Sequence, residues 1–260
     1  MNFSIEGVLG KLKNKNFYNI EVVDKVSSTN DVLKQKALLG CKEGETLIAL
    51  SQTKGKGRLG RVFYSPQRTG LYMSIILRPD LMAQDAVLIT TAAAVAIAKA
   101  TEEISGRKAQ IKWVNDIYIE GKKVCGILVE AGINQKEQKL DYAVLGIGIN
   151  VYAPCGGFPE EIKDIADAVF PLPENDIRNV LCARVLDNFY EFYKNLSDKS
   201  FVEEYISRSC VVGKNIKVIL NCGEKDAVCT GIDERCRLRV QYNDGSEELL
   251  SSGEISIKVQ

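Results

Sequence analysis

The stretch TKGKGRLGRVFYSP, residues 53–66, concentrates the chemistry of this chain, because cations alternate with glycines along it. Its four cations are Lys54, Lys56, Arg58 and Arg61. No acidic residue lies anywhere between positions 45 and 80. Guanidinium and ammonium groups form strong charge-assisted bonds to phosphate and carboxylate, so the pattern predicts an anion site. The alternative is that this charge run is only a solvated surface.

The glycine spacing matches two nucleotide-binding patterns and satisfies neither. Gly55, Gly57 and Gly60 fit G-x-G-x-x-G, but a dinucleotide site needs a helix to begin there, and RVFYSP favours a strand that stops at proline. In the phosphate-loop frame, Arg61 replaces lysine and Val62 replaces the Ser or Thr that would hold Mg²⁺. We therefore reject both patterns.

The chemistry that best fits the loop is the attack of a carboxylate on the α-phosphate of a nucleotide. Two like charges 4 Å apart repel by roughly 4 kcal/mol at an effective dielectric near 20, so cations must lie between them. The chain has no histidine, which excludes Ser-His-Asp and Cys-His nucleophiles, histidine bases and histidine metal ligands. A carboxylate needs no such base. The loop thus predicts a ligase that activates acids as adenylates, with a glycine-rich arm that is mobile until its ligand binds.

The bulk composition limits partners and compartment. Among 260 residues, Lys plus Arg and Asp plus Glu both number 34, so the net charge of zero does not indicate a polyanionic partner. The eight cysteines contain no C-x-x-C, which favours small apolar fillers of a reduced protein over a zinc site. No signal peptide is recognisable, and the apolar run at 86–98 is too short to span a bilayer. We expect a cytoplasmic protein.

The elements that must position the loop follow from periodicity and turn signals. A helix is expected at 28–40, with Ser28 as its N-cap, Asp31 completing a capping box and Gly40 ending it. Strands at 46–52 and 71–77 would flank the loop. A helix is expected at 83–104, followed by strands at 110–114, 116–120 and 124–132, with a hairpin turn at 120–123 between the last two. A further strand is expected at 142–151, and the chain should be helical from 160 to about 209. Short strands should follow from residue 211 onward, with a turn at 242–246.

This order predicts an α+β fold, a mixed β-sheet with flanking helices, rather than a doubly wound sheet. The change from helix to short strands near residue 211 predicts two domains, 1–210 and 211–260. No internal repeat or low-complexity segment interrupts either part.

Four motifs, taken in order, resemble the biotin–protein ligases (biotin–acetyl-CoA-carboxylase ligases). They are SSTN, SQTKGKGRLGR-x-F-x-SP, KWVNDIYIEGKKVCGILVE and GIGINV, and the resemblance covers about 22–152. It implies a class II synthetase-like catalytic domain, and the β-rich tail matches the small C-terminal β-barrel of the family. It also implies two steps. Biotin and Mg-ATP give biotinyl-5′-adenylate and pyrophosphate, and a lysine of a biotin carboxyl carrier domain then attacks the mixed anhydride.

The same resemblance assigns residues position by position, with Lys123 and Arg58 as the catalytic pair. Lys123 on its hairpin would neutralise charge that develops at the α-phosphate. The biotin site would comprise Ser28, Thr29, Asn30, Gln52, Gly55, Lys56, Gly57, Arg58, Lys123, Gly126 and Gly146. The ATP or adenylate site would comprise Arg58, Arg61, Phe63, Lys112, Asn115, Asp116 and Asn150, with Phe63 beside adenine. Mg²⁺ would arrive with ATP, and no protein ligand for it is legible.

Simpler interpretations stand beside these assignments. Ser28 could be only a helix cap, and Lys123 only a solvated hairpin cation. Asn115 and Asp116 could form a plain turn, and Trp113 could simply pack in the core, as could Tyr118. The chain departs from the usual family pattern at Lys56, where Arg is most common and whose bidentate fork is lost, and at Val114, where the motif usually has proline.

Two alternative functions predict sequence features that differ from those of a biotin ligase. A lipoate–protein ligase shares the chemistry but lacks the G-K/R-G-R-x-G-R loop. A nucleic-acid-binding module would carry excess positive charge and aromatics interleaved with cations, and the net charge here is zero. Too few residues precede the first motif for a helix-turn-helix domain, so we expect a monofunctional ligase that does not bind DNA. Family members occur as monomers and as sheet-to-sheet dimers; the sequence does not decide between the two states, and a homodimer is only slightly favoured.

Overall fold

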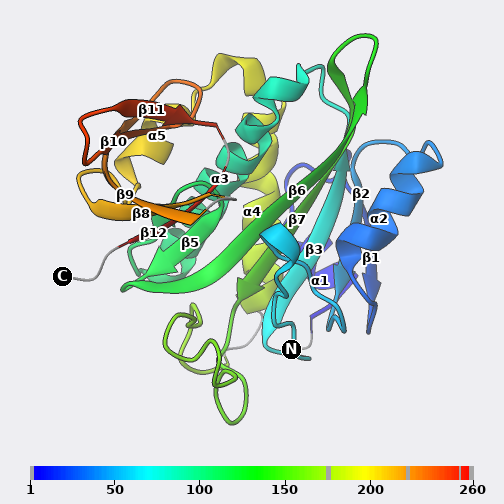
Figure 1. Ribbon diagram of the computed structural model, residues 1–260. Coiled ribbons are helices and arrows are strands. Elements are labelled where there is room, and N and C mark those ends of the chain that lie inside the picture. The colour runs from blue at the N-terminus through cyan, green and yellow to red at the C-terminus, as the bar shows by residue number, and fades with distance from the viewer. Residues whose placement is uncertain (1–2, 174–176, 221–222, 252, 258–260) are drawn as a thin grey trace.

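Two β-sheets organise the chain in the computed structural model, which describes residues 3–173, 177–220, 223–251 and 253–257 (Figure 1). The larger sheet has seven strands in the order β1 (Asn19–Val23), β2 (Glu45–Ala49), β3 (Gly70–Leu77), β7 (Lys139–Asn150), β6 (Lys122–Asn134), β5 (Asp116–Ile119) and β4 (Gln110–Lys112). Strands β1 and β2 are parallel and the other neighbours antiparallel, so the expected mixed sheet is confirmed.

Helices cover both faces of this sheet (Figure 1). Helices α3 (Val87–Ser105) and α4 (Ile177–Tyr193) pack against each other behind it, and α2 (Thr29–Leu38) packs over β2, β3 and β7. Strand β3 is consequently buried along its whole length, with Ile75 in the core of α3 and α4 and Ile76 in a second cluster beneath α2. A short helix, α1 (Ile5–Leu9), packs against α4.

Most element expectations agree with the structure to within a few residues. Ser28 caps α2 by accepting a hydrogen bond from the Asp31 N–H. The hairpin turn between β5 and β6 has positive φ at Glu120 and Gly121, as a tight two-residue turn requires. The helix expected at 83–104 begins later, because 83–85 form a separate 3-10 turn (η2, Ala83–Asp85), and it ends at Gly106 with φ +68°.

The helix expected from residue 160 is wrong over 160–173 and lies partly outside the described residues. This segment runs instead along the end of β6, where the Lys123 backbone N–H donates to the Ile165 carbonyl at 2.8 Å and the Asp167 N–H donates to the Lys123 carbonyl at 2.9 Å. Residues 159–166 form short turns that do not continue as a helix, and the N–H groups of residues 167, 169 and 170 donate to the carbonyls of Lys123, Asn150 and Val151. The prolines at 171 and 173 also oppose a helix. Further along, α4, η3 (Leu196–Asp198) and α5 (Val202–Ser207) bear out a largely helical region.

The C-terminal strands form an antiparallel sheet that is not closed into a barrel, which corrects that expectation. Its order is β11 (Glu247–Leu250), β10 (Leu238–Tyr242), β9 (Gly223–Ile232), β8 (Asn215–Leu220) and β12 (Glu254–Ile257). The two edge strands have four residues each, too few to curl the sheet until they pair. The turn predicted at 242–246 is present between β10 and β11, where the Tyr242 backbone N–H donates to the Ser246 carbonyl at 2.8 Å.

The two sheets share one apolar core. Trp113, immediately after β4, is 4% exposed, and its indole N–H donates at 2.8 Å to the carbonyl of Cys236 in the turn between β9 and β10. Tyr205 of α5 donates to the Val114 carbonyl at 3.1 Å. Trp113 thus packs in the core, as its simpler interpretation held.

The described cysteines are all unpaired, and four of them are buried fillers as expected: Cys125, Cys182, Cys229 and Cys236. Cys155 differs in being exposed, and Cys222 lies outside the described residues. Over the part of the chain that the structure describes, no helix is both long and apolar enough to cross a membrane.

Candidate functional site

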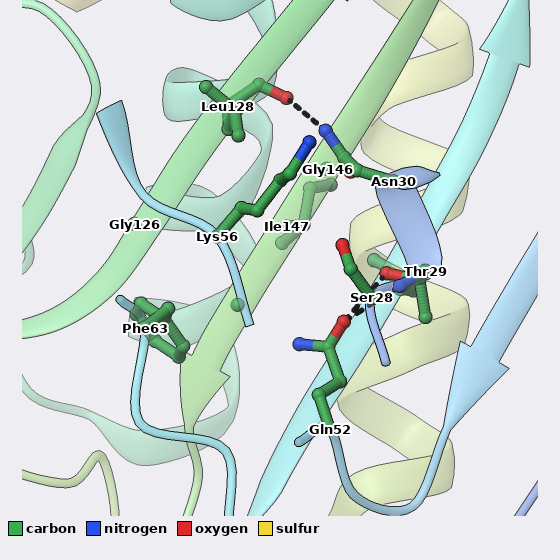
Figure 2. A pocket seen from close by; sticks show the side chains of 12 residues that line it. Ser28, Thr29, Asn30, Gln52, Lys56, Phe63, Gly126, Leu128, Gly146 and Ile147 are labelled. Carbon is green, nitrogen blue, oxygen red and sulfur yellow. Dashed lines mark hydrogen bonds between the residues drawn. The ribbon is translucent and has the colours of Figure 1, made fainter. Parts of the chain in front are cut away.

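A small cavity opens on the α2 side of the large sheet, where the N-terminus of α2 faces β6 and β7 (Figure 2). Its volume is about 20 Å³, room for roughly one water molecule. It is lined by Ser28, Thr29, Asn30, Gln52, Lys56, Phe63, Met73, Gly126, Leu128, Gly146, Ile147 and Gly148. Polar groups at one end and backbone glycines below give it the make-up of a small-ligand site.

Three glycines form the floor of this cavity. Gly126 pairs with Gly148 across β6 and β7, and Gly146 lies two residues along the same face. A Cβ at Gly146 would lie 2.1 Å from the Asn30 Oδ1, and one at Gly148 would lie 2.6 Å from the Phe63 ring. The floor must therefore be bare backbone for Asn30 and Phe63 to lie on it.

Gln52 carries the polar wall opposite the floor (Figure 2). Its Oε1 accepts from the Thr29 N–H at 2.8 Å and from the Thr29 hydroxyl at 3.2 Å. Its Nε2 donates to Ser65 at 3.1 Å. The hydroxyl of Ser28 accepts from the Asp31 N–H at 3.4 Å, so its own proton remains available toward the cavity.

Asn30 and the glycine loop meet at a carboxylate on β6. The Asn30 amide donates to Glu130 at 3.1 Å, and Lys56 of the loop binds both Glu130, at 3.4 Å, and Asp31. Burial alone would raise the pKa of Glu130, but the Asn30 bond and the lysine charges outweigh it and hold this pKa below its ordinary value. The hydrogen bond to Asp31 raises the pKa of Lys56. Asp31 therefore pairs with the loop instead of completing a capping box.

A second and much larger cavity, about 310 Å³, lies on the other side of Phe63, which lines both. It contains four cationic side chains: Arg58, Arg61, Lys112 and Lys123. The rest of the lining is Gly57, Leu59, Val62, Phe63, Tyr64, Trp113, Asn115, Asp116, Tyr118, Asn150, Phe158, Ile162, Ile165, Ala166, Glu254 and Ile255. Cations with aromatic and apolar walls suit a ligand that has both phosphates and a flat ring.

Lys123 lies at the junction of the two cavities. Its Nζ is 2.7 Å from the Asp116 carboxylate and 3.3 Å from the point where a Gly126 Cβ would lie. Lys112 projects over the Tyr118 ring, 5.7 Å from its centroid, and burial lowers the pKa of this lysine. A desolvated ammonium gains more from an arriving phosphate than a solvated one does.

The glycine loop also touches the second sheet. Arg58 donates to the Asn115 side chain at 3.1 Å and to the Gly253 carbonyl at 2.9 Å, and Arg61 forms an ion pair with Glu254 of β12. The loop tip is a 3-10 turn, η1 (Arg58–Gly60), in which Leu59 has φ +54° and is exposed. Within the described part of the chain, no group of three or more acidic or cysteine side chains could hold a metal.

Comparison of this chain with known proteins identifies its family. The biotin/lipoate A/B protein ligase family matches residues 22–150, and the biotin protein ligase C terminal domain matches residues 211–258. The bifunctional ligase/repressor BirA of Bacillus subtilis is 34% identical over 233 residues, which cover 88% of this chain and 71% of that protein. This chain belongs to the biotin protein ligase family.

Other relatives agree with this membership. The biotin–[acetyl-CoA-carboxylase] ligase of Mycobacterium tuberculosis is 27% identical, and the alignment covers 91% of this chain and 88% of the relative. The biotin protein ligase of Aquifex aeolicus, solved in complex with biotin and ATP, superimposes with a TM-score of 0.74 at 29% identity. That superposition covers 94% of this chain and all of the Aquifex chain.

The structure gathers nearly all of the predicted site residues around the two cavities. Eight line the small one: Ser28, Thr29, Asn30, Gln52, Lys56, Phe63, Gly126 and Gly146. Gly57, Arg58, Arg61, Lys112, Asn115, Asp116, Lys123 and Asn150 line the large one with Phe63. Gly55 lines neither. It is buried in the loop stem, where a Cβ would lie 2.4 Å from the Phe63 carbonyl.

Four site residues escaped the sequence analysis. Ser65 and Ser74 hold cavity-lining side chains from behind, and Ser74 donates to the Asn30 Oδ1 at 2.6 Å. Glu130 and Glu254 come from strands and bind the loop cations. Ser65 and Glu130 stand inside the quoted motifs but were given no role there, and Ser74 and Glu254 stand outside them. Their roles depend on the folded register, which alone brings them to the loop.

Proposed function

We propose that this chain activates biotin with ATP as biotinyl-5′-adenylate and transfers the biotinyl group to a lysine of a carrier domain such as that of acetyl-CoA carboxylase. One observation carries the proposal. A small polar-walled cavity and a large cation-lined cavity meet at Phe63, with Lys123 at the junction. A bicyclic acid in the first and a nucleotide in the second would bring a carboxylate against the α-phosphate.

The roles of the residues follow from their positions. The biotin ring would enter the small cavity against Ser28, Thr29 and Gln52, with its carboxylate toward Lys123. At about 20 Å³ the cavity must widen for this, and the Phe63 ring is the side chain placed to swing toward the nucleotide side. Asn30 and Gly146 would bound the ring, and Gly126 would let its chain pass close to the backbone.

The triphosphate would lie along Arg58, Arg61 and Lys112, with Phe63 beside adenine and Asn115, Asp116 and Asn150 around the nucleotide. Arg58 and Lys123 would neutralise the carboxylate and the α-phosphate as they approach, removing a repulsion of roughly 4 kcal/mol at 4 Å. Lys56 and Gly57 would complete the loop over the ligand. Loss of pyrophosphate leaves a mixed anhydride, which an incoming lysine amine attacks at the carbonyl, releasing AMP.

Mg²⁺ belongs to this proposal as a partner of ATP. The carboxylates in the large cavity, Asp116 and Glu254, are already paired with Lys123 and Arg61. The ion would therefore be held mainly by phosphate oxygens and water, where it would neutralise charge on the leaving pyrophosphate.

Biotin is favoured over lipoate by the C-terminal match, since the sequence that follows residue 210 corresponds to a biotin protein ligase domain. We extend the proposal to a catalytic domain at 1–210 and a small domain at 211–260, a cytoplasmic location and a homodimer. Sedimentation equilibrium with and without biotin and ATP tests the dimer.

The proposal predicts that Arg58→Ala and Lys123→Ala each lower biotin-dependent pyrophosphate release by about a hundredfold or more, because each removes a cation from the reacting atoms. Labelled biotin, ATP and a biotin carboxyl carrier domain are incubated with each variant, and transfer to the carrier lysine is scored. Circular dichroism checks that both variants are folded. Near-wild-type turnover in both would overturn the site assignment.

A further inference from the structure

Ser65 lies directly after the glycine loop and is 5% exposed. Its hydroxyl accepts a hydrogen bond from the Gln52 Nε2 at 3.1 Å and donates one to the Phe63 carbonyl at 2.9 Å. Its own carbonyl accepts from the Gln52 N–H at 3.1 Å. One buried serine thus binds the residue that enters the loop and the residue that leaves it.

The stem of the loop closes around this hydroxyl. The Phe63 N–H donates to the Gly55 carbonyl at 2.9 Å, and a Cβ at Gly55 would lie 2.6 Å from the Ser65 Oγ. The hydroxyl therefore fills the space that a side chain at Gly55 would need. Because a hydroxyl has one proton and two lone pairs, Ser65 can serve Phe63 as donor and Gln52 as acceptor at once.

The two partners of Ser65 line different parts of the site. Gln52 lines only the small cavity and is bound to the N-terminus of α2 through Thr29. Phe63 lines both cavities. A continuous chain of bonds therefore runs from α2 through the Gln52 amide and the Ser65 hydroxyl to the Phe63 backbone.

We propose that Ser65 is a positioning residue for adenylate formation: its hydroxyl fixes the Gln52 amide and the Phe63 backbone relative to each other, and so sets the biotin ring relative to the nucleotide. The inference rests on the proposed function. Ser65 lines neither cavity, so it acts through Gln52 on biotin affinity and through Phe63 on the approach of the two substrates. Misplacement of reactants by a fraction of an ångström is enough to slow a reaction that depends on alignment.

The first test is Ser65→Ala. Loss of the hydroxyl leaves the Gln52 Nε2 amide and the Phe63 carbonyl without this partner, and we expect kcat/KM for biotin to fall by about tenfold while KM for ATP stays within about twofold. Ser105→Ala is the matched control, because the Ser105 hydroxyl donates to the Thr101 carbonyl at 2.7 Å at the far end of α3. That variant should keep wild-type kinetics.

A double-mutant cycle with Gln52→Ala separates positioning from mere stabilisation. If Ser65 acts through Gln52, removing Gln52 first should leave Ser65→Ala with less than about threefold further effect on KM for biotin, since two residues in one chain of bonds are not additive. A purely structural role predicts the full effect in both backgrounds, together with equal changes in KM for biotin and ATP.

Wild-type protein is the reference that separates this inference from the proposed function. If wild type releases pyrophosphate with biotin and ATP, and Ser65→Ala matches it within twofold, the inference on Ser65 fails and the function stands. If Ser65→Ala also unfolds at room temperature, the cycle is run with Ser65→Cys, which keeps the size but donates and accepts weakly. Additive effects in that cycle would equally refute positioning. If wild type releases no pyrophosphate, the proposed function itself fails.

Discussion

At the scale of single residues, the decisive feature of the small cavity is an absence of side chains. The polar end of α2 can approach the sheet only because Gly146 has no Cβ, which would lie 2.1 Å from the Asn30 Oδ1. Asn30 in turn binds Ser74 and Glu130, so its amide is held from two strands. The glycine is needed for close approach and not for an unusual backbone angle, since its φ is not positive.

We therefore predict that Gly146→Ala displaces Asn30 and abolishes detectable biotin binding by isothermal titration calorimetry, while lowering the free energy of unfolding by about 1–3 kcal/mol. Gly231→Ala on β9 is the matched control, because its Cβ would meet no atom within 4 Å and its φ is not positive. A Gly146→Ala variant that bound biotin as wild type does would show that the floor tolerates a side chain.

At the scale of elements, the glycine loop is fastened at both ends. Lys56 joins it to α2 and β6, Arg61 joins it to β12, and Arg58 joins it to Gly253 immediately before β12. These are partly exposed contacts, and exposed ion pairs contribute only about 0–1 kcal/mol each, so the loop can open without a large cost. The loop is thus held closed weakly enough to admit a ligand.

From this we expect loop residues 54–61 to gain protection from hydrogen exchange when biotin and ATP are added together, because the ligand phosphates would add charge-assisted bonds to Arg58 and Arg61. Mass spectrometry of peptic fragments measures it. The turn at 242–246 lines neither cavity, so it serves as the internal control and should exchange at the same rate in both samples. Equal exchange of the loop with and without ligands would contradict the expectation.

The extent to which the sequence predicts these elements depends on whether the decisive contacts are local. The flanking strands, the cap at Ser28 and the turn at Gly121 follow from local patterns, and all are present. The prediction of a helix at 160–173 was wrong because the segment forms short turns and then donates backbone bonds to Lys123, Asn150 and Val151, partners that local patterns do not indicate. The open C-terminal sheet was missed for a similar reason, since closure depends on edge pairing that composition does not encode.

At the scale of the whole molecule, the two sheets pack into a single hydrophobic core. A single apolar cluster contains Ile111 and Trp113 from the first sheet and Leu238 and Val240 from the second. The loop cations reach β12 across the same boundary. Glu254 and Ile255 line the nucleotide-sized cavity, so removing the C-terminal sheet would open both the core and the site.

We therefore predict that the chain unfolds in one cooperative transition, although its sequence divides into two parts. Trp113 is the single tryptophan, and its indole N–H is bonded to the Cys236 carbonyl, so its fluorescence reports separation of the sheets. Far-UV circular dichroism reports loss of the strands and helices everywhere. In a urea titration the two signals should give the same midpoint, because a shared core cannot lose one half without exposing apolar surface on the other. A fluorescence midpoint at clearly lower urea would mean that the C-terminal sheet detaches first, and the sheets would then be independent units joined by a weak contact. Trp113→Phe keeps an aromatic side chain but loses the N–H donor and part of the ring volume. It should lower the common midpoint in the dichroism signal by an amount equivalent to about 1–3 kcal/mol, since the Cys236 carbonyl then stays buried without this partner and a small cavity is left.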